Sequence, residues 1–246
     1  EPKKYLKYPH MLITHDENNH LLAYVTGQHC KGDHGQSPAK YEKFVYSNQF
    51  GFSISKGDSL ESGAFDSTLA FSRKGENRYC MRYGMTDFYG DDKSLTTVYS
   101  PMNGVEVTST VVPCSPWHVR VHQIKTREAI EIADGGFALP QEECFKVIPG
   151  RATGRFEAKD VHKTETSVFA GFPWGSSGIV SETGDRAELE IPFANTNLFY
   201  NLTVIPTVKA QLEPGNHLIV TSVAGDFYKD WKSLMEEKPA VEIGEM

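Results

Sequence analysis

Hydrophobic and polar residues alternate along much of this chain, in short runs separated by glycine, proline, asparagine and aspartate. In the segment WHVRVHQI (117–124), the tryptophan, both valines and the glutamine fall on one face. Both histidines and the arginine fall on the other face, with the isoleucine. This period of two is typical of β-strands. The pattern predicts strands at Leu21–Val25, Lys43–Ser47, Phe50–Ile54, Phe65–Phe71, Arg78–Tyr83, Leu95–Tyr99, Val105–Val112, Trp117–Lys125, Glu128–Ala133, Ser167–Phe172, Ala187–Ile191, Leu198–Val208 and His217–Val223.

Many short strands at this spacing predict an all-β fold, a large antiparallel β-sandwich. Turn residues agree, because DGG (134–136) offers positive-φ positions after a strand and EPGN (213–216) is a strong turn signal. The segment Asp226–Glu237 has Phe227, Trp231 and Leu234 at helical spacing, and Pro239 follows it. This predicts one short C-terminal helix. Because there is no repeat or low-complexity linker, we expect a single domain over residues 1–246.

Charge and hydropathy exclude two classes of partner. The net charge is −7, and lysine and arginine are scattered along the chain. Nucleic acid is therefore excluded as a partner, since phosphate neutralisation needs a basic surface. No apolar run approaches the length of a membrane span, so we expect no membrane partner.

The ends and the cysteines give weaker indications. The start EPKK has no methionine and resembles a linker, which favours the C-terminal part of a longer protein over a processed secreted one. The compartment stays open, with a periplasmic or secreted location favoured over the cytoplasm. Four separated cysteines form no C-x-x-C pair, so they favour buried free thiols over a metal cluster, and disulfides stay possible in an exported protein.

The candidate site lies between His10 and Lys43, where five of the nine histidines fall. Imidazoles, carboxylates and amides are the groups that share protons and hold sugar hydroxyls, and polar loops on β scaffolds often carry function. No histidine spacing here matches a zinc site, so we expect a polar ligand cleft, no metal and no cofactor. The cleft candidates are His15, Asp16, Asn18, His20, Gln28, His29, Asp33, His34 and Lys40.

Two fainter features lie elsewhere. Trp174 lies in a stretch rich in glycine and serine, which we interpret as a loop in which the indole either stacks on a sugar ring or covers the end of the core. The pair Asp91-Asp92 is more typical of a solvated turn than of paired catalytic carboxylates, and no catalytic residue is assigned from the pattern.

Three segments carry a family resemblance. They are HDENNH (15–20), GQH (27–29) and PAKYEKFVYSNQFGFS (38–53), of which the aromatic-rich part of the last is the most specific. In these segments the chain resembles the C-terminal half of a bacterial and fungal family catalogued as the domain of unknown function 2264. The order and length of the remaining sequence are compatible with that resemblance.

The resemblance implies a role in polysaccharide processing. Members of this family are similar to carbohydrate-active enzymes in which an α/α-toroid precedes a β-sandwich, either glycoside hydrolases acting on uronic-acid sugars or polysaccharide lyases. The chain would then be the sandwich that supports the toroid and edges its substrate cleft, with carbohydrate and that toroid as partners and little activity alone. The alternatives are a free-standing carbohydrate-binding module and a non-enzymatic interaction domain.

Overall fold

The structure is a computed structural model of the chain. It describes residues 5–8, 11–15, 21–25, 43–48, 51–54, 69–76, 85–91, 93–114, 116–136, 139–140, 160–172, 175–183, 187–190, 193–196, 201–204, 206–226 and 229–244. Within this part of the chain every strand pair is antiparallel. The fold is therefore all-β, as the alternation predicts.

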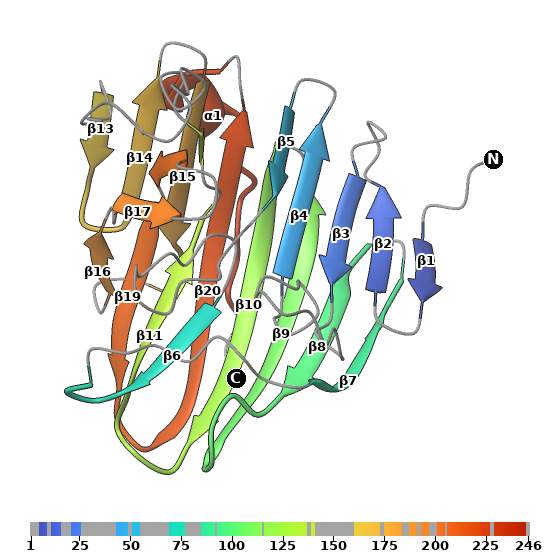
Figure 1. Ribbon diagram of the computed structural model, residues 1–246, viewed down its shortest axis with the longest axis vertical. Helices are drawn as coiled ribbons and strands as arrows, with labels where there is room; N and C mark the ends of the chain where they lie inside the picture. The colour runs from blue at the N-terminus through green and yellow to red at the C-terminus, as the bar shows by residue number, and fades with distance from the viewer. Residues whose placement is uncertain are drawn as a thin grey trace.

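One large sheet forms a complete layer of the molecule (Figure 1). Its eight strands lie in the order β13-β14-β15-β20-β10-β9-β8-β7. Their bounds are β7 (Met85–Gly90), β8 (Leu95–Tyr99), β9 (Val105–Cys114), β10 (Trp117–Thr126), β13 (Asp160–Lys163), β14 (Ser167–Phe172), β15 (Gly175–Ser181) and β20 (Gly215–Asp226).

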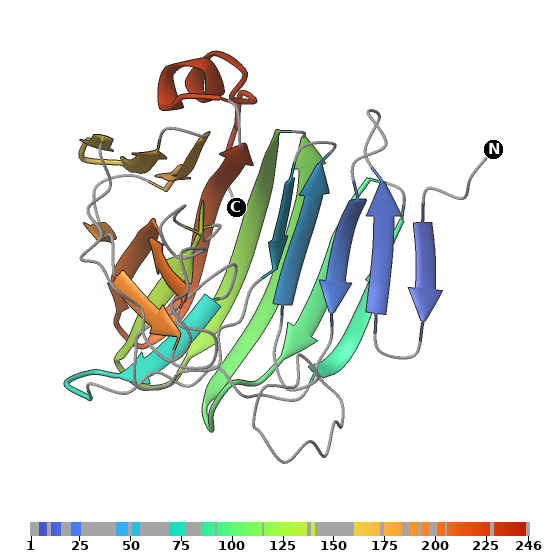
Figure 2. The ribbon, with the colours of Figure 1, turned by 45° about the horizontal axis from the view of Figure 1, so that its top comes forward.

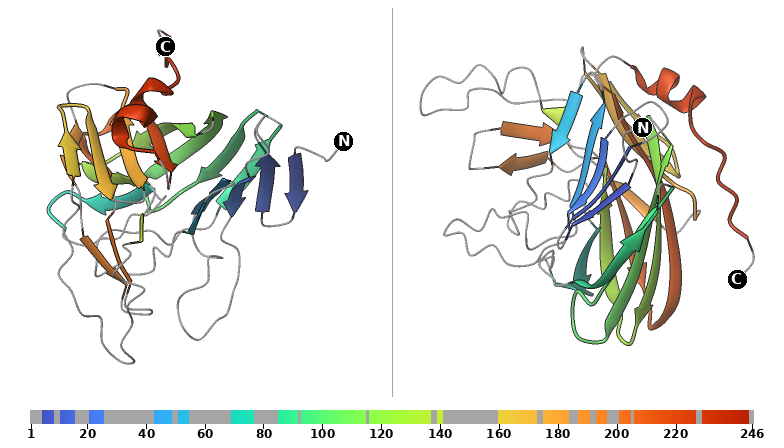
Figure 3. Two further views of the ribbon diagram at one scale, coloured as in Figure 1. Left: turned by 90° about the horizontal axis from the view of Figure 1, so that it is seen from above. Right: turned by 90° about the vertical axis from the view of Figure 1, so that its right-hand side faces the viewer.

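The second layer consists of smaller sheets on one side of the large sheet (Figure 2; Figure 3, right). One has the order β16-β19-β11-β6, with β6 (Leu69–Arg73), β11 (Ile130–Gly135), β16 (Ala187–Glu190) and β19 (Thr207–Leu212). A five-stranded sheet contains β1 (Tyr5–Tyr8), β2 (Met11–His15), β3 (Leu21–Val25), β4 (Lys43–Asn48) and β5 (Gly51–Ile54). A third contains β12 (Leu139–Pro140), β17 (Phe193–Thr196) and β18 (Asn201–Val204).

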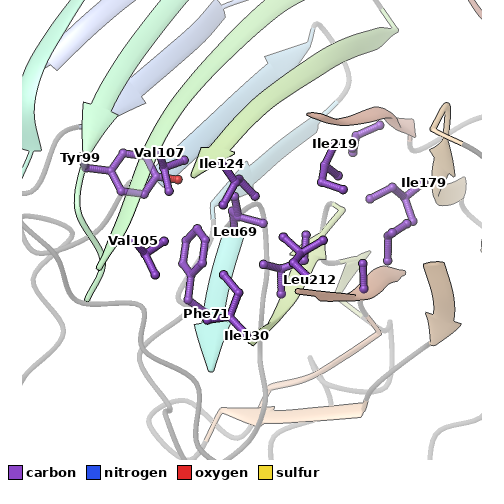
Figure 4. Close-up of a cluster of buried hydrophobic side chains, with 14 of the residues drawn as sticks. Leu69, Phe71, Tyr99, Val105, Val107, Ile124, Ile130, Ile179, Leu212 and Ile219 are labelled. Atoms are coloured by element: carbon purple, nitrogen blue, oxygen red, sulfur yellow. The ribbon is translucent and has the colours of Figure 1, made fainter. Parts of the chain in front are cut away.

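The apolar core fills the space between the four-stranded sheet and the large sheet. Figure 4 shows Leu69 and Phe71 of β6 among side chains from the large sheet. The rings of Phe71 and Tyr99 meet edge to face, with their centroids 6.2 Å apart. Because one residue in two along β9, β10 and β11 points into this layer, the alternation in the sequence specifies which side chains are buried.

A short helix, α1 (Trp231–Glu236), covers part of the outer face of the large sheet. Asp230 caps it by accepting a hydrogen bond from the Ser233 amide at 2.9 Å. Trp117 is fully buried beneath the helix and donates its Nε1 hydrogen to the Leu234 carbonyl at 2.8 Å. The predicted helix is confirmed, but it begins later than Asp226, because that residue ends β20.

One predicted strand is two. The segment Leu198–Val208 contains β18 and the start of β19, with Pro206 between them. Proline has no amide hydrogen for a strand ladder, and its carbonyl instead accepts from the Gly136 amide at 2.8 Å. The predicted turn at 213–216 joins β19 to β20, and Gly215 has a φ of +152°. The predicted strand Arg78–Tyr83 lies outside the described residues.

Candidate functional site

A cluster of charged and polar side chains lies inside the sandwich, in the layer that also holds the apolar core. Asp134 of β11 faces β10 and β20 of the large sheet and is fully buried. Arg120 Nη2 lies 3.0 Å from Asp134 Oδ1, and Thr221 donates its hydroxyl to Asp134 Oδ2 at 2.6 Å. His122 Nε2 lies 3.4 Å from the same Oδ2. We call Ser109, His118, Arg120, His122, Asp134 and Thr221 the buried ionic cluster.

The cluster joins the two layers at a single carboxylate. Arg120 and His122 belong to β10 and Thr221 to β20, whereas Asp134 belongs to the four-stranded sheet. Arg120 Nη2 also donates to the Gly135 carbonyl at 2.8 Å. Strand β11 therefore contributes both acceptors, and the large sheet contributes the donors.

The charges set the protonation of Asp134. Burial alone would raise the pKa of this carboxyl. The Arg120 guanidinium lowers this pKa the most, and His122 and Thr221 lower it by smaller amounts. Together the three groups hold the pKa of Asp134 below its usual range. Asp134 is therefore a buried carboxylate that stays ionised with Arg120 as its counter-ion.

His118 is a buried histidine of the cluster. It lies two residues before Arg120 on the same face of β10 and is 1% exposed. Burial, and next the positive charge of Arg120, lower the pKa of His118 well below its ordinary value, although Asp134 acts the other way. His118 is therefore a neutral imidazole at neutral pH.

A hydrogen-bond chain continues from His122 across the large sheet. His122 Nδ1 lies 2.7 Å from Ser109 Oγ, which lies 3.1 Å from the Tyr99 hydroxyl. Serine, histidine and aspartate in contact are also the groups of a hydrolase triad. Here Ser109 is fully buried, and a substrate carbonyl cannot reach its Oγ in this conformation. The chain thus satisfies buried polar atoms and does not form a nucleophile.

A hollow of about 540 Å³ lies on the opposite, outer face of the large sheet, near the end of β8, β9, β10 and β20. Its polar side chains include Glu106, Thr108, Gln123, Lys125 and Asn216. Glu106 and Lys125 form an exposed ion pair at 3.8 Å. These groups can donate to and accept from hydroxyls, but an antiparallel sheet also commonly presents such a face to water.

The predicted cleft residues are not brought together by the described part of the structure. His15 is the last residue of β2, where its backbone pairs with Leu21 of β3. The other candidates lie outside the described residues: Asp16, Asn18, His20, Gln28, His29, Asp33, His34, Lys40 and Trp174. The stretch from His10 to Lys43 is nevertheless not one loop, because it contains strands Met11–His15 and Leu21–Val25.

Two loop predictions were wrong, and both involve glycine. Residues 175–181 form β15, and a Cβ at Gly178 would lie 2.0 Å from the Phe169 ring of the paired strand. Glycine is required there for close approach and does not mark a turn. Asp134 and Gly135 continue β11 because Arg120 and Thr221 bind their oxygen atoms from the facing sheet.

Asp91 behaves as the sequence predicts. It lies in the turn between β7 and β8 and accepts hydrogen bonds from the Lys93 and Ser94 amides, each at 2.8 Å. These bonds lower the pKa of the exposed carboxyl. Asp91 is a turn residue.

The buried ionic cluster is not predicted from the sequence. The alternation places His118, Arg120 and His122 on one face with Ile124, and this shared face is the signal that the sequence contains. The partner strand is not evident, because Asp134 has the residue type and neighbours of a turn. Among the described residues, no group of three or more histidine, cysteine, aspartate or glutamate side chains is arranged to hold a metal ion. In the same residues, no helix is long and apolar enough to cross a membrane.

Two antiparallel layers around a mixed apolar and ionic interior define the class of this protein as a β-sandwich. The chain belongs to the family described as the DUF2264 C-terminal domain, whose model matches residues 1–242. The family suggested by the three segments is therefore confirmed. No curated protein sequence matches the chain significantly.

Several solved structures share the fold. A mutant of the heparan sulfate lyase HepC from Pedobacter heparinus aligns with a TM-score of 0.61 at 10% identity, over 93% of this chain and 37% of that one. A heparinase III aligns with a TM-score of 0.57 at 8% identity, over 93% and 37%. A mutant chondroitin AC lyase from Streptomyces coelicolor A3 aligns with a TM-score of 0.51 at 9% identity, over 92% and 32%. This chain thus spans about a third of the length of these proteins.

Proposed function

We propose that this chain is the β-sandwich domain of a polysaccharide-processing enzyme, and that it supports and edges a substrate cleft completed by an α/α-toroid domain of the same protein. The observation that carries the proposal is the fold similarity to the lyases over more than nine-tenths of this chain. Because identity to them is near 10%, the similarity supports the architecture and leaves the reaction to be tested.

The buried ionic cluster has a supporting role in this proposal. Its polar groups face one another between the layers and not solvent. It fixes β11 against the large sheet and so keeps the scaffold rigid, which is what residues presented by neighbouring loops need. The cleft side chains would come from the His15–Lys40 segment, with Lys40 binding a carboxylate and Asn18, Gln28 and His29 binding hydroxyls.

Heparan sulfate and chondroitin sulfate are the substrates to try first, since two lyases that share the fold are named for heparan sulfate and chondroitin. The full-length gene product would be incubated with each polymer. Lyase products carry an unsaturated uronate that absorbs ultraviolet light, whereas hydrolase products carry a new reducing end without that absorbance. Either product supports the proposal and assigns the reaction, and absence of both across a panel of uronate polymers contradicts it.

The placement of the cleft is tested separately in the same full-length protein. We expect His15→Ala and His29→Ala to lower turnover at least tenfold while the melting temperature stays within a few degrees. His217→Ala, at the β19–β20 turn, is the matched control and should retain activity. A fall in melting temperature with unchanged specific activity would make His15 and His29 structural.

The isolated chain distinguishes a shared cleft from a free-standing binding module. A domain that supplies only one side of a cleft should bind heparan sulfate far more weakly than the full-length enzyme. Equal affinity of the two would favour the module, with Trp174 as the first residue to replace.

A further inference from the structure

The hollow of about 540 Å³ on the outer face of the large sheet is formed by side chains from neighbouring strands. Strands β8, β9, β10 and β20 lie side by side there (Figure 1). The register places Thr108 of β9 directly opposite Gln123 of β10. Two residues along the same face, Glu106 lies opposite Lys125, which has Asn216 of β20 on its other side. The polar side chains of the hollow therefore stand in two adjacent rows.

The spacing of these rows suits a ligand rich in hydroxyl groups. Adjacent strands lie about 4.8 Å apart, and residues two apart along a strand lie about 6.8 Å apart. A sugar ring with its hydroxyl groups covers a comparable area. Gln123 and Asn216 are exposed, and Thr108 is half-buried. Because amide and hydroxyl groups both donate and accept, these three side chains can pair with sugar hydroxyls in either direction.

The charges of the hollow favour an uncharged ligand. Glu106 and Lys125 form an ion pair at 3.8 Å, and their side chains are 65% and 59% exposed. The carboxylate offsets the ammonium group, so this pair does not supply the net positive charge that a sulfate or carboxylate needs. The chain as a whole has a net charge of −7, which repels a polyanion at longer range. A neutral sugar therefore fits the hollow better than a sulfated one.

An exposed aromatic ring extends this surface. Tyr89 of β7 is 50% exposed, and among the described tyrosine, phenylalanine and tryptophan side chains it is the only exposed one. It pairs with Thr96, whose hydroxyl meets that of Thr110 on the outer face at 2.9 Å. Tyr89 thus stands in the row next to that of Val98 and Thr108. An aromatic ring can stack on the C–H face of a sugar. A hollow, convergent amides and an aromatic ring together are typical of a ligand site, whereas a face that only meets water needs polar groups alone.

We propose that the surface formed by Tyr89, Thr108, Gln123, Lys125 and Asn216 binds an uncharged stretch of a glycan chain. We call these residues the outer glycan surface. The surface lies on the face of the large sheet that points away from the second layer. The inference does not depend on the proposed function, because binding is measured without turnover and with uncharged sugars in place of uronate polymers.

The test is a titration of the chain with uncharged hexasaccharides, followed through its amide resonances in nuclear magnetic resonance spectra. Cellohexaose, xylohexaose and mannohexaose would be added separately up to about 10 mM, because a shallow site with few contacts binds weakly. We expect at least one of them to shift the side-chain amide resonances of Gln123 and Asn216, and to leave the backbone amides of β11 and β19 unchanged. A heparan sulfate hexasaccharide should not shift the same resonances. The proposal is overturned if none of the three sugars shifts them, or if heparan sulfate shifts them equally.

Variants assign the binding to the outer glycan surface. Gln123→Ala removes an amide that bonds the sugar and should weaken binding about three- to tenfold, and Tyr89→Ala should weaken it by a similar factor. The matched control is Gln211→Ala, since Gln211 is an exposed glutamine of β19 whose amide lies 3.4 Å from Glu131. This control should bind like the wild type. All three positions are exposed, so the melting temperatures should stay within a few degrees of one another. If Gln123→Ala and Tyr89→Ala bind the sugar as tightly as the wild type, the sugar is held elsewhere and the proposal is refuted.

Discussion

Two neighbouring regions of one layer hold this sandwich together in different ways. Around Phe71 and Ile130 the sheets meet mainly through apolar side chains, and the contact gains free energy from surface removed from water. Around Asp134 they meet through an ion pair and hydrogen bonds. The first region tolerates imperfect geometry, whereas the second needs every partner present, because an unmatched buried charge costs more than the matched pair contributes.

The largest expected effect comes from removing one partner of the ion pair. Arg120→Ala leaves the buried Asp134 carboxylate without its guanidinium and should lower the free energy of unfolding at pH 7 by about 3–5 kcal/mol, measured by urea denaturation. The matched control is the double variant Arg120→Met with Asp134→Leu, which removes both charges and should recover most of that loss. A single-variant loss below about 1 kcal/mol would mean that the pair is already solvated.

The apolar region provides the next largest effect and the contrast in pH dependence. Ile132→Ala removes buried atoms from the face of β11 that carries Asp134 and should cost about 2–5 kcal/mol. Because no proton is involved, the cost should be the same at pH 7 and pH 5 within the error of the denaturation curves. A cost that changes by more than about 1 kcal/mol between the two pH values would show that the two regions are coupled.

The two regions also differ in how far the sequence predicts them. Apolar alternation through Ile130 and Ile132, and through WHVRVHQI, specifies both the strands and their buried faces, because burial of one face fixes the register. Asp134 and Gly135 break that pattern locally, since both residue types favour turns. Their strand conformation depends on Arg120, which lies fourteen residues from Asp134 and fifteen from Gly135, and a local pattern does not contain those contacts.

The same limit applies to the candidate site. Gly178 resembles a loop residue until the Phe169 ring of the neighbouring strand is placed against it, after which only glycine fits. The cleft candidates from His15 to Lys40 and Trp174 were selected by residue type, and their convergence stays a prediction. The family was accessible from the sequence because it depends on residue identity in contiguous segments such as PAKYEKFVYSNQFGFS, and not on contacts between distant strands.

The smallest effect concerns a single hydrogen bond within the ionic region. Thr221→Val keeps the shape of the side chain and removes the hydroxyl that donates to Asp134 Oδ2 at 2.6 Å, so it should cost about 1.5–3 kcal/mol at pH 7.

This bond is one cause of the lowered pKa of Asp134, whose stabilising contribution is present above the unfolded pKa of about 3.9 and is lost as pH falls through the lower native pKa. The cost of the substitution should therefore shrink as pH falls below about 3.9, toward the lowered native pKa at which the carboxyl becomes protonated. Thr110→Val is the matched control, since Thr110 bonds only Thr96 on the outer face among the contacts described, at 2.9 Å, and its smaller cost should not vary with pH. If the cost of Thr221→Val stays constant across that range, the Thr221 hydroxyl does not affect the ionisation of Asp134 and contributes only to packing.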